Sequence, residues 1–309
     1  LIHGDKVVYN VGSRGIALSK TNGSLKWKTA SGTPGYATPV RYDHRGTEAF
    51  IMFGPSYAYG VNAATGKQLW SKSFKSSDIN AADPVLYDGK IFLSSSNFNP
   101  GCELIELSGT STSSKWKNRN MRIYLNAGVV IGDYLYGADG TTNRGNTVRC
   151  INMETGETEW TKNSIPCASI TAADAKLIIL SRTGDLYIAE ASPSRFIQLA
   201  KAKVITGTCV TVPVLANRSL YVRNSRGTLY KLQMSEMVIE TQPLAVNFAG
   251  SDLEFSWPAK GNFALESTDA LGQTANWSEV GSAAAKEDDR YIVRVRPSAG
   301  QQFFRLRSE

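Results

Sequence analysis

Four arginines recur one or two positions before a glycine in short polar turns of this chain. They are Arg14 in GSRG, Arg144 in TNRG, Arg182 in SRTG and Arg226 in NSRG. Each turn follows a run of β-branched or aromatic residues, so each arginine is expected in a hairpin turn. Guanidinium groups hold carboxylates or sulfates through paired hydrogen bonds, so these arginines could together bind an anionic ligand. The simpler alternative is that Arg-Gly only suits a solvated hairpin.

A second set of residues lies just ahead of the first strand of successive repeats. Its members are Tyr36, Thr38, Asn80, Asp83, Tyr124, Asn126, Ser169 and Thr211, with Cys167 and Cys209 at matching positions. Tyrosines beside arginines would suit an anionic polysaccharide through stacking and charge. Asp83 is the only carboxylate of the set, so the paired carboxylates of glycoside hydrolysis are not evident.

Four cysteines and two histidines limit the metal and redox chemistry of the chain. Cys102 and Cys150 fall within expected strands, where a buried free thiol is the default. Cys167 and Cys209 lie one aligned position apart in neighbouring repeats. They could form a disulfide if the protein is exported, although two free thiols are the simpler interpretation. No Cys-x-x-Cys pair occurs, so no metal site is expected.

A repeated motif determines where these side chains lie. In segments that end at Trp27, Trp70 and Trp160, a small residue is followed two positions later by a short polar residue, six later by Gly and ten later by Trp. Successive tryptophans, Trp116 included, are about 43 to 46 residues apart, the period of a four-stranded propeller blade. Each tryptophan is expected to bury its ring between adjacent blades, and the Gly tolerates a positive φ in the turn. Six units can be traced.

Strand signals inside each unit predict which residues share a face. Second strands are expected at 7–11, 50–53, 91–94, 135–138, 177–180 and 220–223, because these runs are β-branched or aromatic and end at turn residues. Neighbouring strands of a blade are antiparallel. The segment that enters the first strand and the turn after the second strand therefore lie on one face. We expect the arginines and the polar set to surround the central channel on that face.

The pattern A-x-[DN]-x-x-T-G-x-x-x-W resembles the tryptophan-docking repeat of the pyrroloquinoline quinone (PQQ) type β-propellers. That superfamily holds quinoprotein alcohol dehydrogenases and cofactor-free relatives such as the outer-membrane assembly lipoprotein of the Bam complex. The resemblance covers 1–240 and is strongest in units one, two and four. Unit three lengthens its turn at 108–114, and units five and six lack both Gly and Trp.

The resemblance implies two functional classes. Quinoprotein members hold PQQ in the channel over a calcium ion, with an Asp as base and usually a vicinal disulfide beside the cofactor. This chain has no Cys-Cys pair, and only Asp83 lies at a channel position that suits a base. These departures favour a non-catalytic binding or scaffold module for a protein or glycan partner, without a cofactor. Binding or processing of an anionic polysaccharide is a further alternative.

The pattern changes after the propeller. From about residue 241 the period stops and short alternating strands follow, which predicts a small β-sandwich-like domain at 241–309. The phrase from Phe263 through Trp277 to the final FFRL resembles a short C-terminal β-module of secreted bacterial proteins. Together the two resemblances imply an extracytoplasmic protein.

Charge and hydropathy exclude further classes. The net charge of +7 is spread along the chain without a dense basic run, so nucleic acid is not an expected partner. No apolar run approaches the roughly 18 residues of a membrane-spanning helix. Alignment of the repeats places Leu1 inside a first strand, without a preceding Met or signal peptide. We therefore expect a truncated N-terminus, a signal peptide upstream, and seven or eight blades in the intact protein.

Overall fold

The computed structural model describes residues 1–76, 80–96, 100–141, 147–233, 243–259, 263–270, 276–298 and 300–308. In these ranges the regular structure consists of β-strands. The chain divides into two compact units, Leu1–Ser235 and Glu236–Glu309. The predicted all-β class is confirmed. Among the described residues, no helix is long and apolar enough to cross a membrane.

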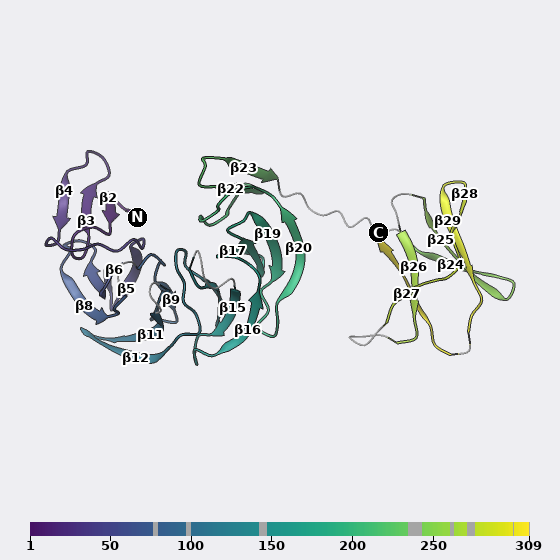
Figure 1. The fold of residues 1–309 in the computed structure, drawn as a ribbon, viewed down its shortest axis with the longest axis horizontal. Helices are drawn as coiled ribbons and strands as arrows, with labels where there is room; N and C mark the ends of the chain where they lie inside the picture. The colour runs from purple at the N-terminus through teal and green to yellow at the C-terminus, as the bar shows by residue number, and fades with distance from the viewer. Residues whose placement is uncertain are drawn as a thin grey trace. The chain divides into compact units, whose positions relative to one another are not determined.

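The first three blades of the first unit are four-stranded meanders in which each strand pairs with the next (Figure 1). Blade 1 contains β1 (Ile2–His3), β2 (Lys6–Tyr9), β3 (Ile16–Ser19) and β4 (Leu25–Lys28). Blade 2 contains β5 (Val40–His44), β6 (Thr47–Phe53), β7 (Tyr57–Asn62) and β8 (Gln68–Ser73). Blade 3 contains β9 (Val85–Tyr87), β10 (Lys90–Ser95), β11 (Gly101–Ser108) and β12 (Ser111–Asn118).

The next three blades continue the same order. Blade 4 contains β13 (Val129–Ile131), β14 (Tyr134–Asp139), β15 (Thr147–Asn152) and β16 (Thr158–Asn163). Blade 5 contains β17 (Ser169–Ala173), β18 (Lys176–Leu180), β19 (Asp185–Glu190) and β20 (Ile197–Lys203). In blade 6 the described strands are β21 (Val214–Ala216), β22 (Ser219–Arg223) and β23 (Leu229–Gln233). The predicted second strands correspond to β2, β6, β10, β14, β18 and β22.

Tight turns set the register inside the blades. Between β9 and β10, Asp88 and Gly89 have φ values of 44° and 70°, and between β5 and β6, Arg45 and Gly46 have φ values of 56° and 80°. Two successive positive φ angles define the hairpin turn that matches the twist of antiparallel strands. These turns keep the first strands short and place the crossovers at the opposite ends of the blades.

Three tryptophans bridge consecutive blades, as the repeat predicts. The indole Nε1 of Trp27 donates to the Ala63 carbonyl at 3.1 Å, that of Trp116 to Met153 at 2.7 Å, and that of Trp160 to Ser192 at 2.8 Å. Each acceptor belongs to the next blade. The rings of Trp27 and Trp116 also lie over a turn glycine of that blade. A Cβ on Gly66 would lie 2.5 Å from the Trp27 ring, and one on Gly156 would lie 2.6 Å from Trp116.

The junction between blades 2 and 3 is built differently. Trp70 donates its indole N–H to the Tyr42 hydroxyl at 2.5 Å, within its own blade. Lys72 of β8 reaches Glu103 of β11 at 2.7 Å, and the Glu103 side chain is only 2% exposed. Blade 3 connects β11 to β12 through 109–110 and lacks the Thr-Gly turn. A buried ion pair therefore joins two blades where no docking glycine is present.

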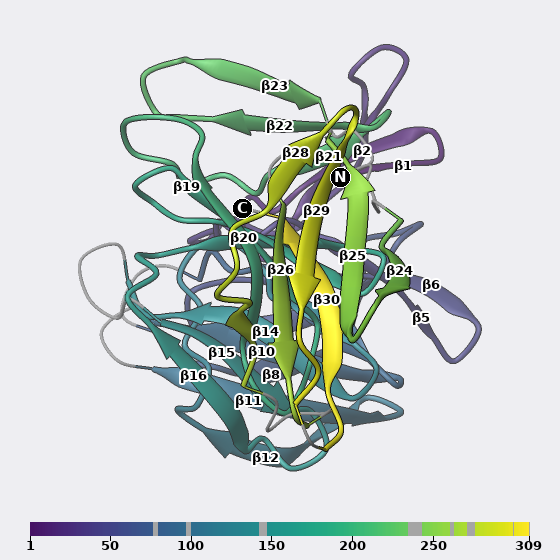
Figure 2. The same cartoon turned by 90° about the vertical axis from the view of Figure 1, so that its right-hand side faces the viewer.

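The second unit consists of two antiparallel sheets (Figure 2). The first has the order β24-β25-β29-β28, and the second has the order β27-β26-β30. Their bounds are β24 (Ala245–Ala249), β25 (Asp252–Pro258), β26 (Phe263–Thr268), β27 (Ser278–Glu279), β28 (Ala285–Glu287), β29 (Arg290–Val295) and β30 (Phe303–Ser308). Phe255, Trp257 and Val293 of the first sheet and Leu265 of the second form one buried core, as in a β-sandwich.

Candidate binding face of the propeller

The arginine turns lie against the crossovers that carry the polar set. In blade 1, the Arg14 backbone N–H donates to Thr29 Oγ1 at 3.0 Å, at the start of the crossover to blade 2. In blade 5, the Arg182 backbone N–H donates to the Pro166 carbonyl, and the Arg182 carbonyl accepts from the Cys209 N–H, both at 2.8 Å. We call this side of the propeller, which carries the crossovers and the turns after the second strands, the crossover face.

One group of the predicted residues gathers between blades 4, 5 and 6. Asn126 Nδ2 donates to Ser169 Oγ at 2.7 Å and to the Val210 carbonyl at 3.1 Å. These residues line a cavity of about 10 Å³ together with Tyr124 and Cys167. That volume is enough for about one water molecule. The hydrogen bonds of Asn126 therefore hold the chain segments around Ser169 and Val210 together, and the cavity between these segments is small.

A second group fastens the crossovers of blades 2 and 3. The Thr38 backbone N–H donates to Asp83 Oδ1 at 2.6 Å. Asn80 is fully buried, and its Nδ2 donates to the Gly54 carbonyl at 2.8 Å. The Tyr36 backbone N–H donates to the Asn80 carbonyl at 3.0 Å. Burial raises the pKa of the Asp83 carboxyl, and the hydrogen bond from Thr38 opposes that shift. Asp83 thus holds a neighbouring crossover in place.

The remaining predicted residues do not join either group in the contacts that the structure describes. Arg226 is exposed, and its backbone N–H donates to Asn224 Oδ1 at 2.9 Å. Thr211 is half-buried, and within the described chain its Oγ1 has no hydrogen-bond partner. Arg144 lies outside the described residues. The grouping of the four arginines around the channel therefore stays a prediction.

All four cysteines are free thiols. Cys102 and Cys150 are fully buried in β11 and β15, which confirms that they are buried free thiols. Burial raises the pKa of each thiol to about 12. Cys167 and Cys209 form no disulfide, in agreement with two free thiols, the simpler of the two interpretations of the sequence. Cys209 packs in an apolar cluster with residues such as Leu220, whereas Cys167 lines the small cavity of blades 4 to 6.

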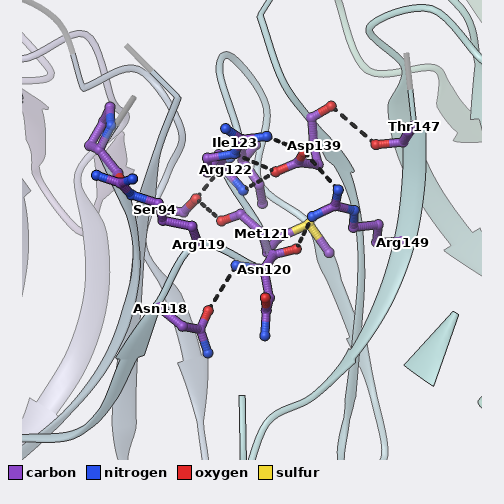
Figure 3. A network of polar contacts seen from close by, with 11 residues as sticks. Ser94, Asn118, Arg119, Asn120, Met121, Arg122, Ile123, Asp139, Thr147 and Arg149 are labelled. Atoms are coloured by element: carbon purple, nitrogen blue, oxygen red, sulfur yellow. Dashed lines mark hydrogen bonds and ion pairs between the residues drawn. The ribbon is translucent and has the colours of Figure 1, made fainter. Parts of the chain in front are cut away.

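Sequence reasoning missed a buried ionic network on the crossover face (Figure 3). The Asp139 side chain, 1% exposed, accepts from the Arg122 backbone N–H at 2.7 Å and pairs with Arg122 Nη2 at 2.9 Å. Arg149 Nη2 lies 3.4 Å from the same carboxylate. Nearby, Ser94 Oγ donates to the Met121 carbonyl at 2.7 Å. Asp139 is the last residue of β14, and Ser94 lies near the end of β10. A polar residue at the end of an apolar second strand is therefore the sequence feature that could have predicted this network.

Two exposed tyrosines, a half-buried tyrosine and a half-buried arginine lie on blades 1 and 2 and on the crossover between them. Tyr57 and Tyr59 stack with their centroids 5.8 Å apart, and the Arg14 guanidinium lies 5.7 Å from the Tyr59 ring centroid. Tyr36 is 72% exposed and Tyr57 is 42% exposed. Asn10 Nδ2 donates to both the Ala37 and Phe53 carbonyls at 3.0 Å, which brings the chain beside Tyr36 next to the end of β6. We call Arg14, Tyr36, Tyr57 and Tyr59 the aromatic patch.

The fold and the repeat define a β-propeller of the PQQ-like class. Residues 1–162 match the model of the family described as outer membrane protein assembly factor BamB, and the chain belongs to that family. The chain is 30% identical to tetrathionate hydrolase from Acidithiobacillus ferrooxidans over 168 residues, which cover 50% of this chain and 32% of that protein. It thus spans about a third of the length of that relative.

Solved structures support the same fold. BamB from Moraxella catarrhalis aligns with a TM-score of 0.60 and 19% identity, over 75% of this chain and 71% of that chain. The computationally designed protein Ika8 aligns with a TM-score of 0.57 and 8% identity, over 75% and 69% of the respective chains. At these identities the two structures show a shared propeller fold and no shared activity.

The cavity of blades 4 to 6 is too small for PQQ. The cavity between Tyr124, Asn126 and Ser169 has about 10 Å³, whereas a tricyclic cofactor needs a pocket on the order of 300 Å³. Asp83 Oδ1 already accepts a backbone hydrogen bond. In the described residues, no three His, Cys, Asp or Glu side chains converge as metal ligands. We therefore derive no chemical step through a quinone from these residues.

Proposed function

We propose that this protein is a non-catalytic, extracytoplasmic binding module that docks a protein partner on the aromatic patch. The proposal rests on the exposure of Tyr36 and Tyr57 together with the stacking of Arg14, Tyr59 and Tyr57. Tyrosine and arginine are enriched at protein interfaces and dominate their binding energy. A side chain that is 72% exposed contributes little to the fold and has most of its surface available for a partner.

The hydrogen bonds of the crossover face support a role without catalysis. Asn80, Asp83 and Asn126 each form a hydrogen bond with a protein group of a nearby turn, crossover or strand. A general base needs an accessible lone pair within reach of a substrate proton. Here these hydrogen bonds stabilise the propeller. A cofactor-free scaffold fits this distribution of polar groups better than an oxidoreductase does.

Membership of the BamB family supports both the location and the kind of partner. The family description names an outer membrane assembly factor, a role that requires contact with other proteins. Export and a protein partner are therefore part of the proposal. An anionic polysaccharide is the competing ligand, because Tyr36 and Arg14 could also stack on and pair with acidic sugars.

Site-specific photo-crosslinking in cells tests the proposal. A benzoylphenylalanine at position 36 of the intact protein should give a discrete protein adduct, and Arg14→Ala should reduce that adduct about tenfold. Position 25 is the matched control, because Leu25 is 52% exposed but follows a tryptophan-motif turn on the opposite face. Equal labelling at 25 and 36, or no protein adduct at 36, would overturn the proposal. Binding of the purified protein to an anionic polysaccharide that Arg14→Ala abolishes would replace the protein partner by a glycan.

A further inference from the structure

A cavity of about 380 Å³ lies in the second unit between its two sheets. Trp257 of β25 and Val293 of β29 line it from one sheet, and Phe263 and Leu265 of β26 line it from the other. The segment 280–284, which crosses from β27 to β28, completes the lining. The volume falls within the range of small-molecule sites in proteins.

The crossing segment explains why this space is not filled. It reads Val-Gly-Ser-Ala-Ala, so small side chains follow Val280. The Val280 backbone N–H donates to the Leu265 carbonyl at 2.9 Å, which fixes the start of the segment on β26. A Cβ added at Gly281 would meet no atom within 4 Å. Residues 281–284 are exposed, so the space opens to solvent at the edge of the sandwich and is not an enclosed void of the core.

An indole of the cavity lining has an unused donor. Trp257 is 1% exposed, and in the described chain its Nε1–H has no hydrogen-bond partner. Buried indole N–H groups ordinarily find an acceptor, as those of Trp27, Trp116 and Trp160 do in the propeller. A ligand oxygen in the cavity would supply the acceptor that the protein does not.

The charge around the cavity limits the ligand. Among the described lining residues Glu279 is the only ionisable one, and its carboxylate pairs with Arg307 Nη2 at 3.0 Å. An anionic ligand would meet the Glu279 carboxylate, and Arg307 already pairs with that carboxylate. We propose that this cavity binds a neutral, largely apolar small molecule with one acceptor oxygen, such as an aromatic ketone or an ester, to which Trp257 donates. This site is independent of the aromatic patch and of its protein partner.

Titration of the intact protein with prodan, a neutral naphthyl ketone whose emission reports polarity and hydrogen bonding, tests the site. We expect saturable, one-to-one binding with a blue-shifted emission. Trp257→Phe keeps an aromatic ring and removes the donor, so binding should weaken about fivefold, the effect of one neutral hydrogen bond. Trp277→Phe is the matched control. The Arg305 guanidinium lies 4.2 Å from the centroid of the Trp277 ring, and Trp277 is not part of the cavity lining. The Trp277→Phe variant should therefore bind prodan within about twofold of the wild type.

Gly281→Leu tests the cavity without touching Trp257. The added side chain has open space at the lining, so the variant should keep the wild-type urea midpoint and bind prodan at least about tenfold more weakly. Absence of saturable binding to the wild type would overturn the site. Unchanged binding in Gly281→Leu would also overturn it. Unchanged binding and emission in Trp257→Phe would remove the assigned hydrogen bond and with it the ligand class.

Discussion

Two blade junctions of this propeller solve one packing problem by different means. Between blades 3 and 4, the Trp116 ring covers Gly156 and its Nε1 donates to the Met153 carbonyl. Between blades 2 and 3, Trp70 donates to Tyr42 of its own blade, and Lys72 pairs with the buried carboxylate of Glu103. The first junction docks an indole on a glycine and adds ion pairs with an exposed carboxylate, such as Lys115 with Glu154 at 3.1 Å. The second has no docked indole and places a carboxylate that is 2% exposed in an ion pair.

The difference follows from one turn. A glycine at positive φ without a side chain lets the indole lie flat on the next blade, as at Gly156, where φ is +74°. Blade 3 has no Thr-Gly turn, and its β11 and β12 extend further. Loss of the docking glycine therefore redirects the tryptophan inward, and the ion pair holds the neighbouring strands. A repeat protein can thus lose its motif in one unit and keep its fold, because each junction is nearly independent of the others.

The largest loss of stability is expected when the ion pair between Lys72 and Glu103 is broken. Lys72→Met leaves the Glu103 carboxylate, 2% exposed, with Lys117 at 3.8 Å as a weaker partner, so the free energy of unfolding should fall by about 3 to 5 kcal/mol. Chemical denaturation of the intact protein measures this loss. The control is Lys115→Met, which removes a more exposed pair with Glu154 and should cost under about 1 kcal/mol. Equal losses in both variants would show that the Lys72–Glu103 pair has no special role.

Glycine substitutions should separate docking from backbone strain. Gly156→Ala places a Cβ 2.6 Å from Trp116 and also strains a residue at φ +74°, so it should cost about 2 to 3 kcal/mol. Gly23→Ala has a similar φ of +71° with no atom within 4 Å, so it should cost only the strain of about 1 kcal/mol. Urea unfolding of the two variants gives the difference. If the two losses are the same, the tryptophan does not depend on the glycine beneath it.

Substitution of Tyr42 should cause a smaller loss of stability, and this loss should depend on pH. Tyr42→Phe leaves the Trp70 donor unpaired and should cost about 1 to 2 kcal/mol near neutral pH. Burial raises the pKa of Tyr42 to about 12, above its usual value of 10.0. The stabilisation by Tyr42 is therefore complete below about pH 10 and declines as the pH rises toward 12. The difference between wild type and variant, measured by denaturation at pH 8 and pH 11, should shrink. A constant difference would contradict the raised pKa.

Much of the fold could be predicted because its signals are local. The spacing of Trp27, Trp70 and Trp116, the turn glycines and the apolar second strands each act within one repeat, so the sequence places the blades correctly. The partner of Trp70 was not predictable in the same way. The partner of Trp70 depends on whether a turn glycine of the following blade lies against the indole. That is a contact between two repeats, and the pattern within one repeat does not determine it.

The site was less predictable, for a related reason. Asp83, Asn80 and Asn126 were expected at the channel where a ligand would bind, and in the structure each forms a hydrogen bond with a protein group of a crossover, a turn or a strand. The spacing of residues in the sequence predicts on which face a polar side chain lies. It does not predict which backbone group forms a hydrogen bond with that side chain. The aromatic patch shows the converse. Only Arg14 and Tyr36 were expected on the binding face, since Tyr57 and Tyr59 lie inside a strand whose exposure sequence alone does not reveal.

The claim that this propeller binds without catalysis is tested most directly by calorimetric titration of the intact protein with PQQ and calcium, followed by a dye-linked dehydrogenase assay across alcohols and sugars. We predict no heat of binding and no dye reduction. Micromolar or tighter binding with dye reduction would contradict the proposed function, and Asp83→Asn would then be the first variant to assay.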